Sequence, residues 1–146
     1  MSCVLVTGAT GVVGSALVPW YLQEETANED GTRTRRYQAQ AVHDFYWEAN
    51  PHFLMTSETI EAVEVTVAWL PAHKRHVPRI MEAARAALHY YGKTYGPYPY
   101  RKLTITDSEL GPGGGGMEYP MIVAVEIPWL QPESIHMIEG IVIHEI

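Results

Sequence analysis

Residues 77–95 read VPRIMEAARAALHYYGKTY, and apolar side chains recur through them at steps of three and four residues. That spacing gathers them on one face of a helix, so we predict a helix over about residues 76–95 that ends at Gly96-Pro97. A helix with one apolar face is stable when that face covers a sheet or another helix. The apolar face consists of Val77, Ile80, Met81, Ala84, Leu88, Tyr91 and Tyr95.

Strand patterns lie on both sides of this helix. Most alternate apolar and polar side chains as half-buried strands do, and Pro120 marks the last one as an edge strand. The predicted strands cover residues 36–42, 63–69, 103–107 and 117–125. A second helix is expected over residues 132–146, with Ile135, Ile138, Ile141 and Val142 facing inward. Together these elements predict an α+β fold in which the long helix covers a mixed sheet.

Composition excludes several classes of protein. With 146 residues, of which 47% are hydrophobic, the chain is long and apolar enough to form a core. A net charge of −7 gives no support for a nucleic-acid or anionic-membrane partner. The single cysteine, Cys3, excludes an intrachain disulfide. No Lys or Arg precedes the first apolar run, so we expect neither a signal peptide nor a transmembrane segment, and the compartment stays open.

A glycine motif lies close to the N-terminus. Residues 3–7 read as a buried strand, and Gly8, Gly11 and Gly14 follow at the start of what we predict to be a helix. Such glycines allow a tight turn, a close approach to a pyrophosphate, and close packing of helix on strand. The run VLVTGATGVVGSALV resembles the opening of extended short-chain dehydrogenases and nucleoside-sugar epimerases over residues 3–24. The resemblance implies a βα unit that binds NAD(P) through these three glycines.

Outside residues 3–24 the chain gives this resemblance little support. No convincing acidic residue for the ribose follows on a second strand, and Arg33 or Arg35 could at best meet a 2′-phosphate. The spacing of the catalytic Tyr-x-x-x-Lys pair of these enzymes occurs once, at Tyr98 and Lys102, which lie outside the residues 3–24 that carry the resemblance. An NAD(P)-binding oxidoreductase or epimerase fragment is therefore the alternative hypothesis.

Several motifs in the second half point to another chemistry. GPGGGGMEYP at residues 111–120 is followed by His144-Glu145 within an apolar helical run. Upstream lie AVHDFYWEANPHF at residues 41–53 and YYGKTYGPYPYRKLTITD at residues 90–107. In this order the motifs resemble the zinc aminopeptidases of the aminopeptidase-N and leukotriene-hydrolase type over residues 30–146. Gly115-Gly116-Met117-Glu118 matches their exopeptidase signature, with Tyr119 in place of the usual Asn, and His144-Glu145 matches the start of H-E-x-x-H.

The resemblance implies the N-terminal lobe of a thermolysin-like catalytic domain and assigns roles to these residues. His144 would be the first zinc ligand, and Glu145 would activate the metal-bound water. Glu118 would bind the free α-amino group of a peptide substrate through a charge-assisted contact. Gly115, Gly116 and Met117 would align the peptide as an added strand. The implied partners are peptide N-termini, and the implied cofactor is zinc.

The second histidine and the glutamate ligand of that family would lie beyond Ile146. One histidine cannot hold zinc tightly, so we expect the chain as given to bind zinc weakly and to hydrolyse no peptides. We expect a truncated or chimeric reading frame with three parts: a Rossmann-like fragment and linker at residues 1–29, the end of a β-rich domain at 30–52, and an incomplete peptidase domain at 53–146. Exposed apolar surface would then favour self-association.

Simpler interpretations cover the remaining candidates. His73, His76 and His89 flank or lie on the long helix and are expected to be structural, as is His43-Asp44. No G-x-S-x-G motif is present, so neither Ser108 nor Ser134 is expected to be a nucleophile. A third hypothesis for function is a non-catalytic module that binds peptide N-termini through Glu118.

Overall fold

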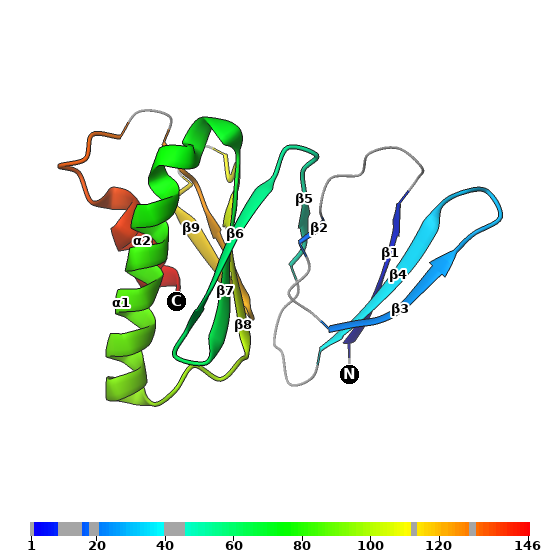
Figure 1. Ribbon diagram of the computed structural model, residues 1–146, viewed down its shortest axis with the longest axis horizontal. Coiled ribbons are helices and arrows are strands. Elements are labelled where there is room, and N and C mark those ends of the chain that lie inside the picture. The colour runs from blue at the N-terminus through cyan, green and yellow to red at the C-terminus, as the bar shows by residue number, and fades with distance from the viewer. Residues whose placement is uncertain (1, 9–15, 18–20, 40–45, 112–113, 129–130) are drawn as a thin grey trace.

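The structure is a computed structural model that describes residues 2–8, 16–17, 21–39, 46–111, 114–128 and 131–146. In this part of the chain a five-stranded sheet lies apart from a three-stranded one, as Figure 1 shows. A two-stranded pairing of β2 (Ala16–Leu17) with β5 (Glu48–Ala49) forms a third, small sheet. The described fold is therefore mixed α/β, with its helices on the five-stranded sheet.

The five-stranded sheet has the order β6-β7-β8-β10-β9. Its two central pairings, β7 with β8 and β8 with β10, are parallel, whereas both outer pairings are antiparallel. The strands are β6 (Leu54–Ile60), β7 (Val63–Trp69), β8 (Lys102–Asp107), β9 (Gly116–Tyr119) and β10 (Ile122–Val125). This arrangement confirms the predicted mixed sheet and leaves β9 at one edge.

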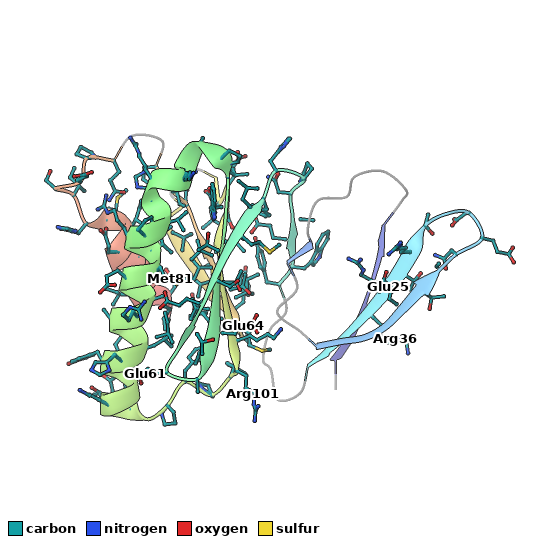
Figure 2. All side chains as sticks on the ribbon, in the orientation of Figure 1. Glu25, Arg36, Glu61, Glu64, Met81 and Arg101 are labelled. Atoms are coloured by element: carbon teal, nitrogen blue, oxygen red, sulfur yellow. The ribbon has the colours of Figure 1, made fainter. Side chains whose placement is uncertain are left out.

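Helix α1 (Val77–Tyr95) connects β7 to β8 and covers one face of the sheet. It follows a 3₁₀ turn, η1 (Pro71–His76), and ends at Gly96, whose φ of 106° favours glycine. Its buried side chains meet those of β7, β8 and β10, and Figure 2 shows Met81 on the side of the helix toward the sheet. Each large side chain buried in this way contributes about 1.5–3 kcal/mol. The predicted helix and the part of its apolar face up to Leu88 are confirmed. Tyr95 was expected on that face but is 81% exposed, because the last turn of α1 extends beyond the buried cluster.

Helix α2 (Met137–Glu145) packs beside α1 and against β9 and β10. It begins five residues later than the predicted 132. Ile138 and Val142 are fully buried as predicted, but Ile135 lies before the helix and is 49% exposed. The expected inner position of Ile135 is therefore wrong, because only the residues after it are coiled.

The predicted strand over residues 117–125 is two strands. Tyr119 pairs with Ile122, and Pro120 and Met121 form the turn between β9 and β10. Met121 has a φ of 68°, and a chain that turns at such a residue cannot continue as one extended strand. The correction matters for function, because it reverses β9 relative to β10 and places it at the sheet edge.

The N-terminal part corrects two further predictions. β1 (Ser2–Gly8) is the predicted strand, but it pairs antiparallel with β4 (Arg33–Ala39), which in turn pairs with β3 (Tyr21–Ala27). The helix expected after the glycine motif is wrong where the structure describes that stretch, since Tyr21–Ala27 is a strand. Short apolar runs do not distinguish helix from strand, and here pairing with β4 decides.

β4 also lies outside the five-stranded sheet, so it does not contribute to the core under α1 as expected. The turn at residues 28–32 joins β3 to β4, and there the backbone amide of Thr32 donates to Asp30. The expected boundary between residues 29 and 30 thus falls within one hairpin. Within the described part of the chain, neither helix is long and apolar enough to cross a lipid bilayer.

Candidate functional site

The residues of the two peptidase-like motifs come together where β9 meets α2. Gly116, Met117 and Glu118 belong to β9, and Gly115 directly precedes it. Glu145 is the last residue of α2, which contacts β9. Since side chains alternate along a strand, residues 116 and 118 share one face of β9, and residues 117 and 119 share the other. Motifs that are 26 residues apart in the sequence therefore meet in space.

Gly116 allows the close approach of the two elements. A Cβ atom built on Gly116 would lie 2.5 Å from both Cγ and Oε1 of Glu145 and 2.7 Å from its Cδ. The side chain of Glu145 thus rests directly on the backbone of β9. Any other residue at this position would displace it.

Glu118 and Glu145 form a pair of neighbouring carboxyl groups. Burial, followed by a hydrogen bond and the negative charge from Glu118, raises the pKa of Glu145, and the charge of His144 opposes this effect. A hydrogen bond between two carboxyl groups requires one of them to carry a proton. The pair can therefore hold one proton, or together receive a cation such as an ammonium group.

Tyr119, the departure from the usual Asn, lies on the opposite face of the strand. Its ring stacks on Tyr46 at a centroid distance of 4.4 Å, next to the small cluster of Phe53, Ala68 and Ile122. The substitution therefore packs the far face of the sheet. Tyr119 therefore does not alter the face of β9 on which Glu118 meets Glu145.

His144 lies on the exposed side of α2. It lines a groove of about 470 Å³ between the ends of the two helices, together with Tyr91, Tyr95 and Tyr98. Burial, and next the charge of Tyr100, raises the pKa of the Tyr98 phenol, so Tyr98 is a neutral wall residue at all physiological pH values. The hydroxyl of Tyr91 donates to the backbone oxygen of Ile143 at 3.0 Å. This bond ties the last turn of α2 to α1.

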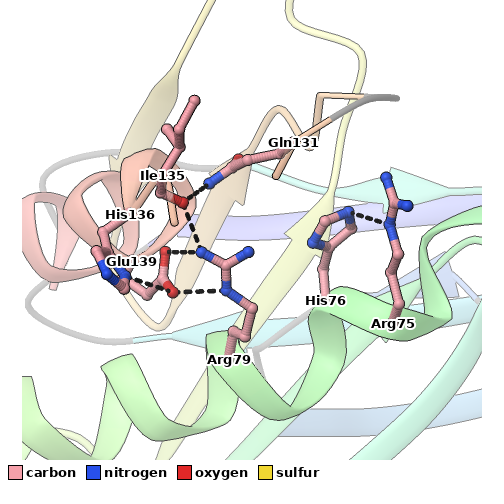
Figure 3. A network of polar contacts seen from close by, with 7 residues as sticks. All are labelled: Arg75, His76, Arg79, Gln131, Ile135, His136 and Glu139. Atoms are coloured by element: carbon pink, nitrogen blue, oxygen red, sulfur yellow. Dashed lines mark hydrogen bonds and ion pairs between the residues drawn. The ribbon is translucent and has the colours of Figure 1, made fainter. Parts of the chain in front are cut away.

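The start of α2 is held by a polar network, shown in Figure 3. Arg79 of α1 donates to both carboxylate oxygens of Glu139, at 2.6 and 3.0 Å. It also donates to the backbone oxygen of Ile135 at 2.6 Å, which accepts a second bond from Gln131. Both ends of α2 are thus anchored to neighbouring elements, which fixes where Glu145 lies.

The described residues do not complete a zinc site. Zinc in proteins takes at least three protein ligands, and His144 is the one histidine that the resemblance supplies. Among the residues that the structure describes, no three His, Cys, Asp or Glu side chains are close enough to hold a metal ion.

The candidate nucleotide site gains no support from the geometry. Gly8 ends β1 in an antiparallel pairing with Arg33, whereas Gly11 and Gly14 lie outside the described residues. Arg33 and Arg35, the candidates for a 2′-phosphate, both donate to Glu25, at 2.7 and 3.0 Å. Their hydrogen bonds lower the pKa of Glu25.

A second group of polar side chains lies at the carboxyl end of β8. The ring of His73 bonds Asp107 at 2.8 Å, and Asp107 also accepts the backbone amide of Leu70 at 2.9 Å. Ser108 is buried and donates to Glu48 at 2.6 Å. These bonds satisfy the groups that end β7 and β8, so the prediction that His73 is structural agrees with its contacts. His43-Asp44 lies outside the described residues.

Sequence reasoning missed Glu126, which follows β10 and lines a groove with Gly114 and Gly115. The available signal was that Glu126 is the single charged residue in the apolar run MIVAVEIP. Neither a comparison with protein-family models nor one with curated proteins matches this chain to a known protein.

Proposed function

We propose that this chain recognises the free N-terminus of peptides at the edge of β9 and serves as the substrate-binding part of a zinc aminopeptidase of the thermolysin-like type. One observation carries the proposal. The carboxyl group of Glu145, at the end of α2, rests on the backbone of Gly116 in the edge strand β9, and Glu118 of the same strand raises its pKa. The resemblance of the two motifs and their convergence are independent, because the sequence does not require that they meet.

The chemistry of this pair suits an α-amino group. An ammonium group has three donors and a positive charge, so it can replace the shared proton and bond both carboxylates. β9 is the edge strand, and the backbone of an extended peptide can add to such an edge. A site that binds both the α-amino group and the backbone of a peptide selects its free N-terminus and does not bind internal segments in the same way.

By the resemblance, the last turn of α2 would also supply part of a hydrolytic centre. His144 would be one zinc ligand and Glu145 the general base, but the described residues hold no three-ligand group. We therefore expect amine-dependent peptide binding by this chain, and no hydrolysis by it alone.

Calorimetric titration with Ala-Ala-Ala and with its N-acetylated form tests the proposal. We expect acetylation, or the substitution Glu118→Gln, to weaken binding by about 10- to 100-fold, because each removes a charge-assisted hydrogen bond of about 1.5–3 kcal/mol. Glu133→Gln is the matched control, since Glu133 is exposed and lies before α2. Equal binding of the free and the acetylated peptide would show that the pair does not recognise amines.

A further inference from the structure

A groove of about 360 Å³ lies beside the glycine loop that precedes β9. The described residues of its wall are small or apolar, apart from one carboxylate. They are Gly111, Gly114, Gly115, Pro128, Met137 and Ile141, together with Glu126. A site of this kind combines room for a side chain with a single charged group.

The groove lies on the same side of β9 as the carboxyl pair. Met137, Ile141 and Glu145 follow one another at four-residue steps, so they share one face of α2 and are about 6 Å apart along its axis. The backbone amide of Glu126 donates to the oxygen of Gly115 at 2.9 Å, which extends the pairing of β10 with β9. A ligand that lies along β9 therefore passes both Glu145 and the groove.

Glu126 has no cationic partner in the described part of the chain. All the Lys and Arg residues lie there, and none of them forms an ion pair with Glu126. Its carboxylate is half-buried and so close to Gly114 that a Cβ at residue 114 would overlap it. A half-buried carboxylate that has no cationic partner interacts most favourably with a ligand that carries a positive charge.

We propose that this groove takes the side chain of the second residue of the bound peptide and that Glu126 selects lysine or arginine there. The inference rests on the proposed binding of the peptide amine at Glu118. An extended chain rises about 3.3 Å per residue, so Gly115 lies about 10 Å along the strand from Glu118. A long basic side chain on the second residue spans the rest of that distance to Glu126. The site therefore prefers peptides of the type X-Lys or X-Arg.

The test compares Ala-Lys-Ala with Ala-norleucine-Ala by calorimetry on the full chain. The two side chains have the same carbon skeleton and differ in charge. We expect the lysine peptide to bind about tenfold more tightly, as one charge-assisted hydrogen bond predicts, and we expect Glu126→Gln to abolish the difference. Glu133→Gln should leave the difference unchanged. Equal affinity of the two peptides for the unsubstituted chain, or a lysine preference that survives Glu126→Gln, would overturn the assignment.

N-acetyl-Ala-Lys-Ala separates this inference from the proposed function. If acetylation weakens binding and the lysine and norleucine peptides bind equally, amine recognition stands and the role of Glu126 is wrong. If acetylation has no effect, the proposed function itself is wrong, and any lysine preference belongs to another mode of binding. A preference for lysine at the third position and not at the second would overturn the placement of the groove.

Discussion

The substitution Gly116→Ala tests the contact on which the proposed site depends. The added methyl carbon would lie 2.5 Å from Cγ and Oε1 of Glu145, well inside van der Waals contact. No positive φ is found at Gly116, so alanine fits the strand backbone and the strain falls on the side chain of Glu145. That side chain is at the last residue of α2 and can rotate away. We therefore expect Glu145 to leave Glu118.

The expected energies separate stability from binding. A Glu145 side chain held about 30° off its preferred rotamer costs about 0.5–1.5 kcal/mol, and the loss of glycine flexibility from the unfolded chain returns about 0.4–1 kcal/mol. The free energy of unfolding should therefore change by less than about 1 kcal/mol. The loss of one of two carboxylates around an ammonium group removes about 1.5–3 kcal/mol of binding, which is about 10- to 100-fold in affinity.

Two measurements on one protein check this expectation. Urea unfolding followed by tryptophan fluorescence gives the stability, and calorimetry with Ala-Ala-Ala gives the affinity. Gly140→Ala is the control, because an added Cβ there meets nothing within 4 Å and Gly140 lies on the same helix. Unchanged affinity in Gly116→Ala would show that Glu145 does not contact the bound amine. A stability loss of several kcal/mol would show that the backbone had moved instead of the Glu145 side chain.

Further expectations concern α2 and the metal. Arg79→Met should lower the free energy of unfolding by about 2 kcal/mol, because it leaves the largely buried Glu139 carboxylate without its charged donor. A double-mutant cycle with Glu139→Gln, measured by urea unfolding, would contradict this if the two substitutions showed no coupling energy. Although burial alone would raise it, hydrogen bonds from Arg79, the backbone and His136 lower the pKa of Glu139. The contribution of ionised Glu139 to the free energy of unfolding should therefore be complete above its ordinary pKa of 4.5. It should be lost as the pH falls through the lower pKa of the folded state, and urea unfolding across that pH range would measure the loss. Gly140→Ala should raise stability by about 0.5–1 kcal/mol, measured by the same urea method, since glycine is a poor helix former and the site is open. Zinc titration should give weak binding that His144→Ala reduces further, and stoichiometric submicromolar binding would contradict the ligand count.

The central elements of the fold could be predicted from the sequence because their patterns are local. The helix over residues 77–95 and the strand over residues 63–69 each bury one face, and a buried face requires apolar residues at a regular spacing in the sequence. The end of the helix is also a local signal, because Gly96 adopts a positive φ that favours glycine. Predictions of this kind were confirmed to within a residue or two.

The errors lie where a choice depends on a distant partner. Residues 21–27 form a strand because β4 is there to pair with them, and ion pairs from Glu25 to Arg33 and Arg35 join the two strands. The turn at Met121 follows from the pairing of β9 with β10. No local period records such partners, since the free energy comes from contacts between strands.

The candidate site divides in the same way. The amino-acid sequence shows which groups are available, namely Glu118 after a glycine run and His144-Glu145 in an apolar helical run. The folded chain brings Glu145 onto Gly116 beside Glu118, and it places Glu126 in a groove one helical turn further along. These distances could not be predicted because they are set by the packing of α2 against an edge strand, and that packing depends on side chains from the whole sheet.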